Sequence, residues 1–185
     1  LEAPRVPPVF LTHVPPGWFE ALRNRFNALY RKGEDVLDAC QVAEVRPEAV
    51  SLIAPENADR LLNLGQLCDL FDSATDWDYV NDPAGRDYFA HPAESHRIRR
   101  GDCDDYAIYL GSLESAVGFE VVIVVGIQRS GQYHTFPEVC LGRMNVEMAS
   151  DYLHARYHLR LTDKVNFRND DDQNLYISLE RGLYP

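Results

Sequence analysis

Apolar residues recur at helical spacing in three parts of the chain. The first stretch begins at Trp18, and we expect Gly33 to end it. The second covers roughly residues 57–71 and carries Cys68 on its apolar stripe, so this cysteine is expected in the core. The third covers about residues 145–159. We therefore predict a helix in each stretch.

A further helix, with recognisable ends, is predicted for residues 103–117. Its apolar stripe consists of Tyr106, Ala107, Leu110, Leu113 and Val117. Asp102 is a good N-cap residue and Gly118 is a suitable C-cap residue, because each matches the conformation and hydrogen bonding that a helix end requires. These caps place Cys103 in the first turn of the helix.

Strands are predicted after this helix. The run FEVVIVVGI, residues 119–127, is rich in β-branched residues and alternates too little to be half exposed, so we expect a buried strand. In YHTFPEVCLG, residues 133–142, alternation separates two faces, His134, Phe136, Glu138 and Cys140 against Thr135, Pro137, Val139 and Leu141. Pro137 indicates an edge position or a bulge. LYISLE, residues 175–180, is predicted as the last strand.

The order of these elements predicts an α+β fold, in which N-terminal helices and the helix bearing Cys103 pack on an antiparallel sheet. Residues 1–17 contain five prolines, which favour an extended arm or linker. Residues 18–185 are expected to form a single domain. The segment 76–95, rich in Asp, Pro and aromatic residues, is predicted as a long ordered loop that leads to Cys103.

Composition and charge narrow the class of partner. The chain has 185 residues, is 45% hydrophobic and carries a formal net charge of -11, which is typical of a globular protein and unfavourable for binding nucleic acid or an anionic membrane. No apolar run is long enough to span a bilayer. The sequence begins at Leu1 rather than Met, which leaves room for an upstream signal or membrane anchor, and hence for either a cytoplasmic or an envelope-associated location.

Three metal or redox interpretations are weak. The four cysteines form no CxxC pair, so neither a zinc ribbon nor a thioredoxin motif is present, although two disulfides are arithmetically possible. His154 and His158 have the i, i+4 spacing of zinc ligands but lack the glutamate of a HExxH motif, and a solvated helix face is preferred. The acidic run 169–172 lacks the pattern of a calcium loop and is expected to be a solvated turn.

Cys103 is the residue most suited to chemistry. The partial positive charge at a helix N-terminus stabilises a thiolate, and the flanking aspartates, Asp102, Asp104 and Asp105, are explained by capping and by the helix dipole. The alternative is a small core cysteine. A reactive thiol needs a cationic partner, for which His134, 31 residues later, is the best candidate; Glu180, a further 46 residues on, could orient the imidazole.

These segments together carry a family resemblance. GDCDDYAIYLGSLESAVGF, followed by YHTFPEVCLG and LYISLE, resembles the transglutaminase-like superfamily of bacterial and archaeal cysteine peptidases, over roughly residues 60–185. The resemblance implies a papain-like, transglutaminase-core fold. It also implies that Cys103 is the nucleophile, His134 its base and ion-pair partner, and Glu180 the orienting acid, at a position where the family more often has Asp.

The family pattern suggests two further roles. An upstream residue is expected to help the Cys103 N–H form an oxyanion hole, and Trp77 or Tyr79 is in the right segment for this. The family often has Ala followed by Trp or Tyr after its histidine, whereas this chain has Thr135 and Phe136. That difference keeps the alternating pattern, and we expect it to alter mainly packing.

The function predicted from these residues is hydrolysis of an amide or peptide bond through a thioester, with a protein or peptide as substrate. This chemistry requires no metal and no cofactor. Two alternatives stay open at this point. The protein could transfer the acyl group to an amine, as a protein-glutamine acyltransferase does, or it could be a catalytically silent binding module that keeps the fold.

Overall fold

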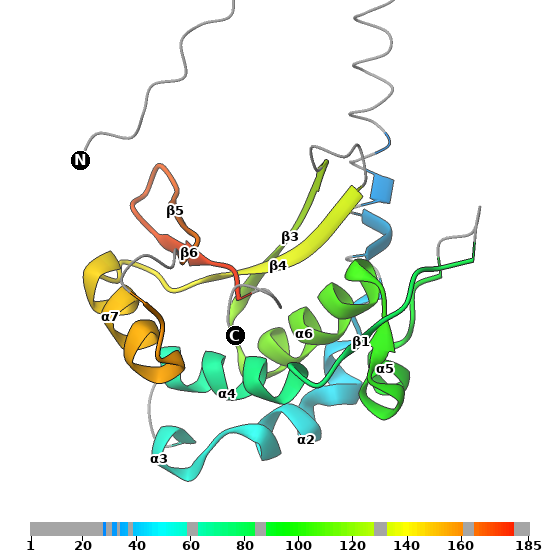
Figure 1. Ribbon diagram of the computed structural model, residues 1–185, viewed down its shortest axis with the longest axis horizontal. Helices are drawn as coiled ribbons and strands as arrows, with labels where there is room; N and C mark the ends of the chain where they lie inside the picture. The colour runs from blue at the N-terminus through cyan, green and yellow to red at the C-terminus, as the bar shows by residue number, and fades with distance from the viewer. Residues whose placement is uncertain are drawn as a thin grey trace, which may run out of the picture.

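The computed structural model of the chain describes residues 28, 31–32, 34–36, 39–58, 63–83, 88–127, 133–160 and 165–179 (Figure 1). The arm predicted for residues 1–17 and the predicted site residue Glu180 lie outside these ranges. Helical residues are found on both sides of Gly33, so the first helix does not end there as predicted.

The described elements are helices followed by an antiparallel sheet. The helices are α2 (Val42–Leu52), α3 (Pro55–Ala58), α4 (Leu64–Ala74), α5 (Pro92–Ile98), α6 (Cys103–Val117) and α7 (Val146–Tyr157). The strands are β1 (Asp78–Tyr79), β2 (Arg100–Gly101), β3 (Glu120–Ile127), β4 (Tyr133–Cys140), β5 (Phe167–Asn169) and β6 (Leu175–Ile177). Strands β1 and β2 form a small parallel pair, and the other four form an antiparallel sheet in the order β3-β4-β6-β5.

Helix α6 lies between the sheet and helices α2, α4 and α5 (Figure 1). It approaches the sheet closely at Gly111, where an added Cβ would lie 3.4 Å from Ile123 and 3.7 Å from Pro137. On its other sides α6 contacts α2, α4 and α5. The α+β architecture predicted from the sequence is therefore confirmed. Cys68 is fully buried in this core, as predicted.

The ends of α6 follow from its sequence. The Asp102 side chain accepts hydrogen bonds from the first turn, and the Asp105 side chain accepts one from the Asp102 N–H, which completes a capping box. At the other end Gly118 has a φ of 110°, a left-handed conformation in which a glycine is preferred. The predicted caps are confirmed, and Cys103 is the first residue of the helix.

The helix predicted for residues 57–71 is instead two helices, α3 and α4. Asn63 is extended, with φ −151° and ψ 168°, and its side chain accepts a hydrogen bond from the Gln66 N–H. Asn at this position stabilises a helix start more than a helix interior, and the chain begins a new helix there. Residues 59–62, within the stretch predicted as one helix, lie outside the described residues.

The predicted strands are present, but their burial agrees with the prediction only in part. On β4 the burial alternates as predicted, with Thr135, Pro137 and Val139 buried. Strand β3 is only partly buried along most of its length, so the prediction of a fully buried strand was wrong. Pro137 pairs with Ile123 of β3, while β6 pairs only with Val139 and Cys140, so the proline lies where β4 has a single described neighbour.

The segment 76–95 was predicted as loop, but part of it is regular. It contains β1 and the beginning of α5, whose first residue is Pro92. Proline at the first helical position is a start signal that the sequence contains.

None of the described helices has the length and hydrophobicity needed to cross a membrane.

Candidate active site

Cys103 borders a pocket with a volume of about 140 Å³. The residues around it come from β1 and its approach, the start of α6, and β4: Trp77, Tyr79, Asp102, Cys103, Tyr106, His134, Thr135 and Phe136. Cys103 and His134 therefore border one cavity, as do both residues suggested for the oxyanion hole. Glu180 lies beyond Leu179, the last described residue of the chain.

Three packing relationships bring these residues together. Strand β2 ends at Gly101 and leads directly to Asp102 and Cys103. Strand β1 pairs with β2 in parallel, and Tyr79 is the register partner of Gly101, so β1 forms one wall beside the thiol. Helix α6 packs on β3 and β4, which brings the start of β4 to the same end of the helix.

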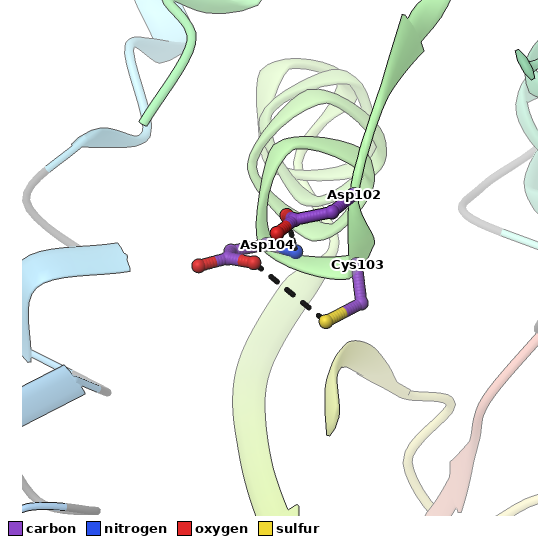
Figure 2. A group of neighbouring side chains, drawn as sticks. All are labelled: Asp102, Cys103 and Asp104. Carbon is purple, nitrogen blue, oxygen red and sulfur yellow. Dashed lines mark hydrogen bonds between the residues drawn. The ribbon is translucent and has the colours of Figure 1, made fainter. Parts of the chain in front are cut away.

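The three aspartates around Cys103 have different hydrogen-bond partners. Asp105 is buried, and its oxygens accept hydrogen bonds from the N–H groups of Ala90 (2.7 Å) and Asp102 (3.3 Å). Asp104 faces the sulfur: the Cys103 thiol donates a hydrogen bond to Asp104 Oδ1, with Sγ 3.6 Å from the oxygen (Figure 2). Asp104 is therefore the aspartate that is hydrogen-bonded to the thiol.

The charge of Asp104 is balanced by Lys32. Its ammonium donates a hydrogen bond to Asp104 Oδ2 at 2.6 Å, and the Asp104 side chain is only 1% exposed. Burial alone would raise the pKa of Asp104, but hydrogen bonds from Asp102 and Lys32 and the charge of Lys32 lower it. Lys32 is 71 positions before Cys103, and nothing in its local sequence indicates this contact.

Asp102 and Asp105 behave differently from Asp104. Burial, followed by the hydrogen bond and charge of Asp104, raises the pKa of Asp102 to about 8. Burial also raises the pKa of Asp105. Of the two coupled acids, Asp104 is therefore the one whose surroundings favour the negative charge, and Asp102 is the one whose surroundings favour the neutral acid.

The ligand atoms of Asp102, Cys103 and Asp104 lie within 4.8 Å of one another, a spacing that a metal ion requires (Figure 2). These groups already have other partners, because Asp102 caps α6 and Asp104 binds Lys32. The ammonium supplies the positive charge that a cation would bring. The alternative pair of zinc ligands, His154 and His158, is not on one helix face, since His158 is the left-handed residue that ends α7.

An aromatic stack supports the pocket wall. Trp77 is 2% exposed, lies stacked on Tyr109 with 5.9 Å between ring centroids, and meets Tyr106 edge-on at 5.4 Å. The buried Tyr109 hydroxyl is hydrogen-bonded to Nδ1 of His96 at 3.0 Å, and Nε2 of His96 is 3.5 Å from Glu48. No sequence pattern indicated these partners of His96, because they lie on two other helices, α6 and α2.

The two residues suggested for the oxyanion hole differ in what they can offer. The Trp77 indole N–H donates to the Gly101 carbonyl at 3.2 Å, so it is already engaged. Tyr79 is 61% exposed. Burial of its hydroxyl raises the pKa of Tyr79, and the neighbouring Cys103 raises it further. Within the described part of the chain the Cys103 N–H has no acceptor, as is usual at the first position of a helix.

All four cysteines have free thiols in the structure. Cys140, which shares a strand face with His134, does not border the pocket and is instead hydrogen-bonded to Tyr176. The acidic run is a turn after β5, where Asp170 accepts hydrogen bonds from the N–H groups of Asp172 and Asn174. It matches the solvated turn that was predicted.

Comparison with known protein families finds no match, and comparison with curated protein sequences finds none either. One solved structure, described as that of "a Putative Cysteine Protease from Cytophaga hutchinsonii", is similar with a TM-score of 0.44 and 14% sequence identity. The similarity covers 57% of this chain and 38% of that chain. A likeness this distant does not assign an activity.

Proposed function

We propose that the protein is a thiol hydrolase of amide or peptide bonds, of the transglutaminase-like type, with Cys103 as nucleophile and His134 as its base. The observation that carries the proposal is that these two residues, from a helix start and a separate strand, border one pocket. Cys103 is also at the position of α6 where the helix dipole favours a thiolate. Glu180 completes the proposed triad, and the sequence resemblance supports its role.

The proposed reaction has two stages. His134 takes the thiol proton, the Cys103 sulfur attacks the carbonyl carbon, and the imidazolium gives its proton to the leaving amine as the C–N bond breaks. Water, deprotonated by His134, then attacks the thioester and releases the acid and the thiol. The Cys103 N–H, with the Tyr79 hydroxyl at the edge of the same pocket, is suited to stabilise the oxyanion in both stages.

Two measurements test this function: the rate at which a thiol-directed alkylator labels Cys103, followed by mass spectrometry, and the release of amine from a casein or peptide mixture. Cys103→Ala should abolish release. His134→Ala should slow both labelling and release by about 100-fold or more. Glu180→Ala should slow both by a smaller factor. Cys140→Ala is the matched control, because Cys140 is outside the pocket, and it should leave both rates unchanged.

Uniform slow labelling of all four cysteines in the unmodified protein, with no amine release, would contradict the proposal. That result would favour a catalytically inactive binding module. Adding a primary amine such as cadaverine separates hydrolase from acyltransferase. A hydrolase forms free acid at an undiminished rate. Incorporation of the amine into the protein substrate would instead identify an acyltransferase with the same nucleophile.

A further inference from the structure

Thr135 presents an unusual hydroxyl. The residue is 1% exposed, it borders the pocket beside His134, and in the described part of the chain its Oγ1 has no hydrogen-bond partner. A buried hydroxyl without a partner costs stability, on the order of 1–3 kcal/mol. A valine of the same shape would avoid that cost on this buried face of β4. The packing of the strand therefore does not explain why this position has a hydroxyl.

Phenylalanine, tyrosine and tryptophan side chains make up half of the lining of the pocket that Thr135 borders. Trp77, Tyr79, Tyr106 and Phe136 are four of its eight lining residues. A volume of about 140 Å³ holds roughly four or five waters at about 30 Å³ each, which matches a side chain of medium size. The negative charge nearest the pocket, that of Asp104, is paired with Lys32. Such a pocket suits an uncharged group with a single hydrogen-bonding end.

We propose that Thr135 determines specificity: its hydroxyl hydrogen-bonds an uncharged polar side chain of the substrate residue that enters the pocket beside Cys103. Carboxamides and hydroxyls have this chemistry, whereas aliphatic side chains of equal size do not. This inference rests on the proposed function, because it treats the pocket as the place where a substrate meets Cys103. It replaces the expectation that Thr135 affects mainly packing.

The test uses a matched pair of vinyl sulfone probes that alkylate thiols, with Asn or its isostere Leu next to the reactive group. The second-order rate of Cys103 labelling is measured by mass spectrometry for the unmodified protein, Thr135→Val and Thr135→Ser. We expect the Asn probe to react faster than the Leu probe in the unmodified protein. Thr135→Val should reduce the Asn-to-Leu ratio by about tenfold or more, and Thr135→Ser should keep it within about threefold.

Thermal unfolding of each variant separates specificity from structure. Thr135→Val should have a Tm equal to or above that of the unmodified protein, because it removes a buried hydroxyl that has no partner. An unchanged Asn-to-Leu ratio in Thr135→Val, or equal slowing of both probes with a lowered Tm, would overturn the inference and leave the hydrolase proposal intact. Labelling of Cys103 no faster than that of Cys40 and Cys140 in the unmodified protein would overturn both.

Discussion

The Cys103 thiol donates a hydrogen bond to a buried carboxylate, that of Asp104, with Sγ 3.6 Å from Oδ1. The same carboxylate binds Lys32 through its other oxygen at 2.6 Å. The thiol, the carboxylate and the ammonium are therefore linked by two consecutive hydrogen bonds. A negative charge beside a thiol disfavours the thiolate, and a positive charge further along the chain partly offsets that effect. The reactivity of Cys103 should follow this balance.

Asp104→Asn should make Cys103 more reactive. The change replaces the negative charge that faces the sulfur with a neutral amide, so negative charge on the sulfur is opposed less. We expect an increase in the alkylation rate of about three- to tenfold. The measurement is the pH dependence of iodoacetamide labelling at Cys103, resolved by peptide mass spectrometry.

Lys32→Met should have the opposite effect. It keeps an apolar stem of similar length but leaves the Asp104 charge without its partner, so Cys103 labelling should become slower by a few-fold. Cys140, outside the pocket, is the internal control in both variants and should keep its rate. If Asp104→Asn and Lys32→Met both labelled Cys103 at the rate of the unmodified protein, the reactivity of the thiol would not depend on this ion pair.

Gly101→Ala should damage the site through the capping box. A Cβ at this position would lie 2.3 Å from Asp105 Oδ2 and 2.5 Å from Asp105 Cβ, and the Gly101 φ of 156° is uncommon for other residues. Asp105 would have to move away from the helix start that holds Cys103. We expect a loss of about 1–3 kcal/mol in the free energy of unfolding, measured by urea denaturation, and slower Cys103 labelling.

Gly126→Ala is the matched control for that substitution. Gly126 lies on β3, and a Cβ there would meet no atom within 4 Å. Its free energy of unfolding should stay within about 0.5 kcal/mol of the unmodified value. If Gly101→Ala were equally mild, the helix start would be more adaptable than the close approach of Asp105 indicates.

The parts of the site that depend on local sequence could be predicted. Asp102 and Gly118 act within one turn of the helix ends that they cap, so residue type and spacing were sufficient to locate α6 and to place Cys103 at its start. The alternation of β4 was equally local. The direction of the Asp104 side chain could not be predicted, because it depends on a contact with Lys32, 72 positions earlier in the chain.

The missed elements have physical reasons as well. Strand β1 has only two residues. It forms because the N–H groups of Asp78 and Val80 donate hydrogen bonds to the carbonyls of Arg99 and Gly101, and so short a strand has no periodicity that a sequence could show. The break before α4 depends on one capping residue, Asn63, inside an apolar pattern that continues across it. The wrong burial prediction for β3 arose because a β-branched run shows strand propensity without showing how many faces are covered.

Arg156 should be important for stability, because it ties α7 to α4. Its guanidinium lies 2.8 Å from Asp69 and 2.6 Å from Asp72, and the Asp69 side chain is 7% exposed. Arg156→Ala should cost about 1–3 kcal/mol in the free energy of unfolding, since a largely buried carboxylate loses a charged partner. The control is Arg100→Ala. The Arg100–Asp78 pair is exposed on both sides, and its loss should cost about 0–1 kcal/mol. Equal losses for the two would contradict this assignment.

Glu114 should make the protein less stable as the pH rises. It lies on α6, is 2% exposed, and its Oε2 has no hydrogen-bond partner in the described part of the chain. Burial raises the pKa of Glu114 well above its ordinary value. The folded protein therefore binds a proton that the unfolded chain releases above about pH 4.3. By linkage the free energy of unfolding falls with rising pH, by at most about 1.4 kcal/mol per pH unit for this one group, until the folded-state pKa is passed.

Glu114→Gln removes this titration while keeping the shape of the side chain. The variant should therefore become more stable relative to the unmodified protein between pH 5 and pH 8, as measured by urea denaturation at several pH values. Asp102 and Asp105 also have raised pKa values, but they are present in both proteins, so the difference between the two curves isolates Glu114. Glu120→Gln, at the exposed start of β3, is the control and should give a difference that is nearly flat with pH. A difference that stayed constant for Glu114→Gln would mean that the buried carboxyl finds compensation in the folded state and keeps an ordinary pKa.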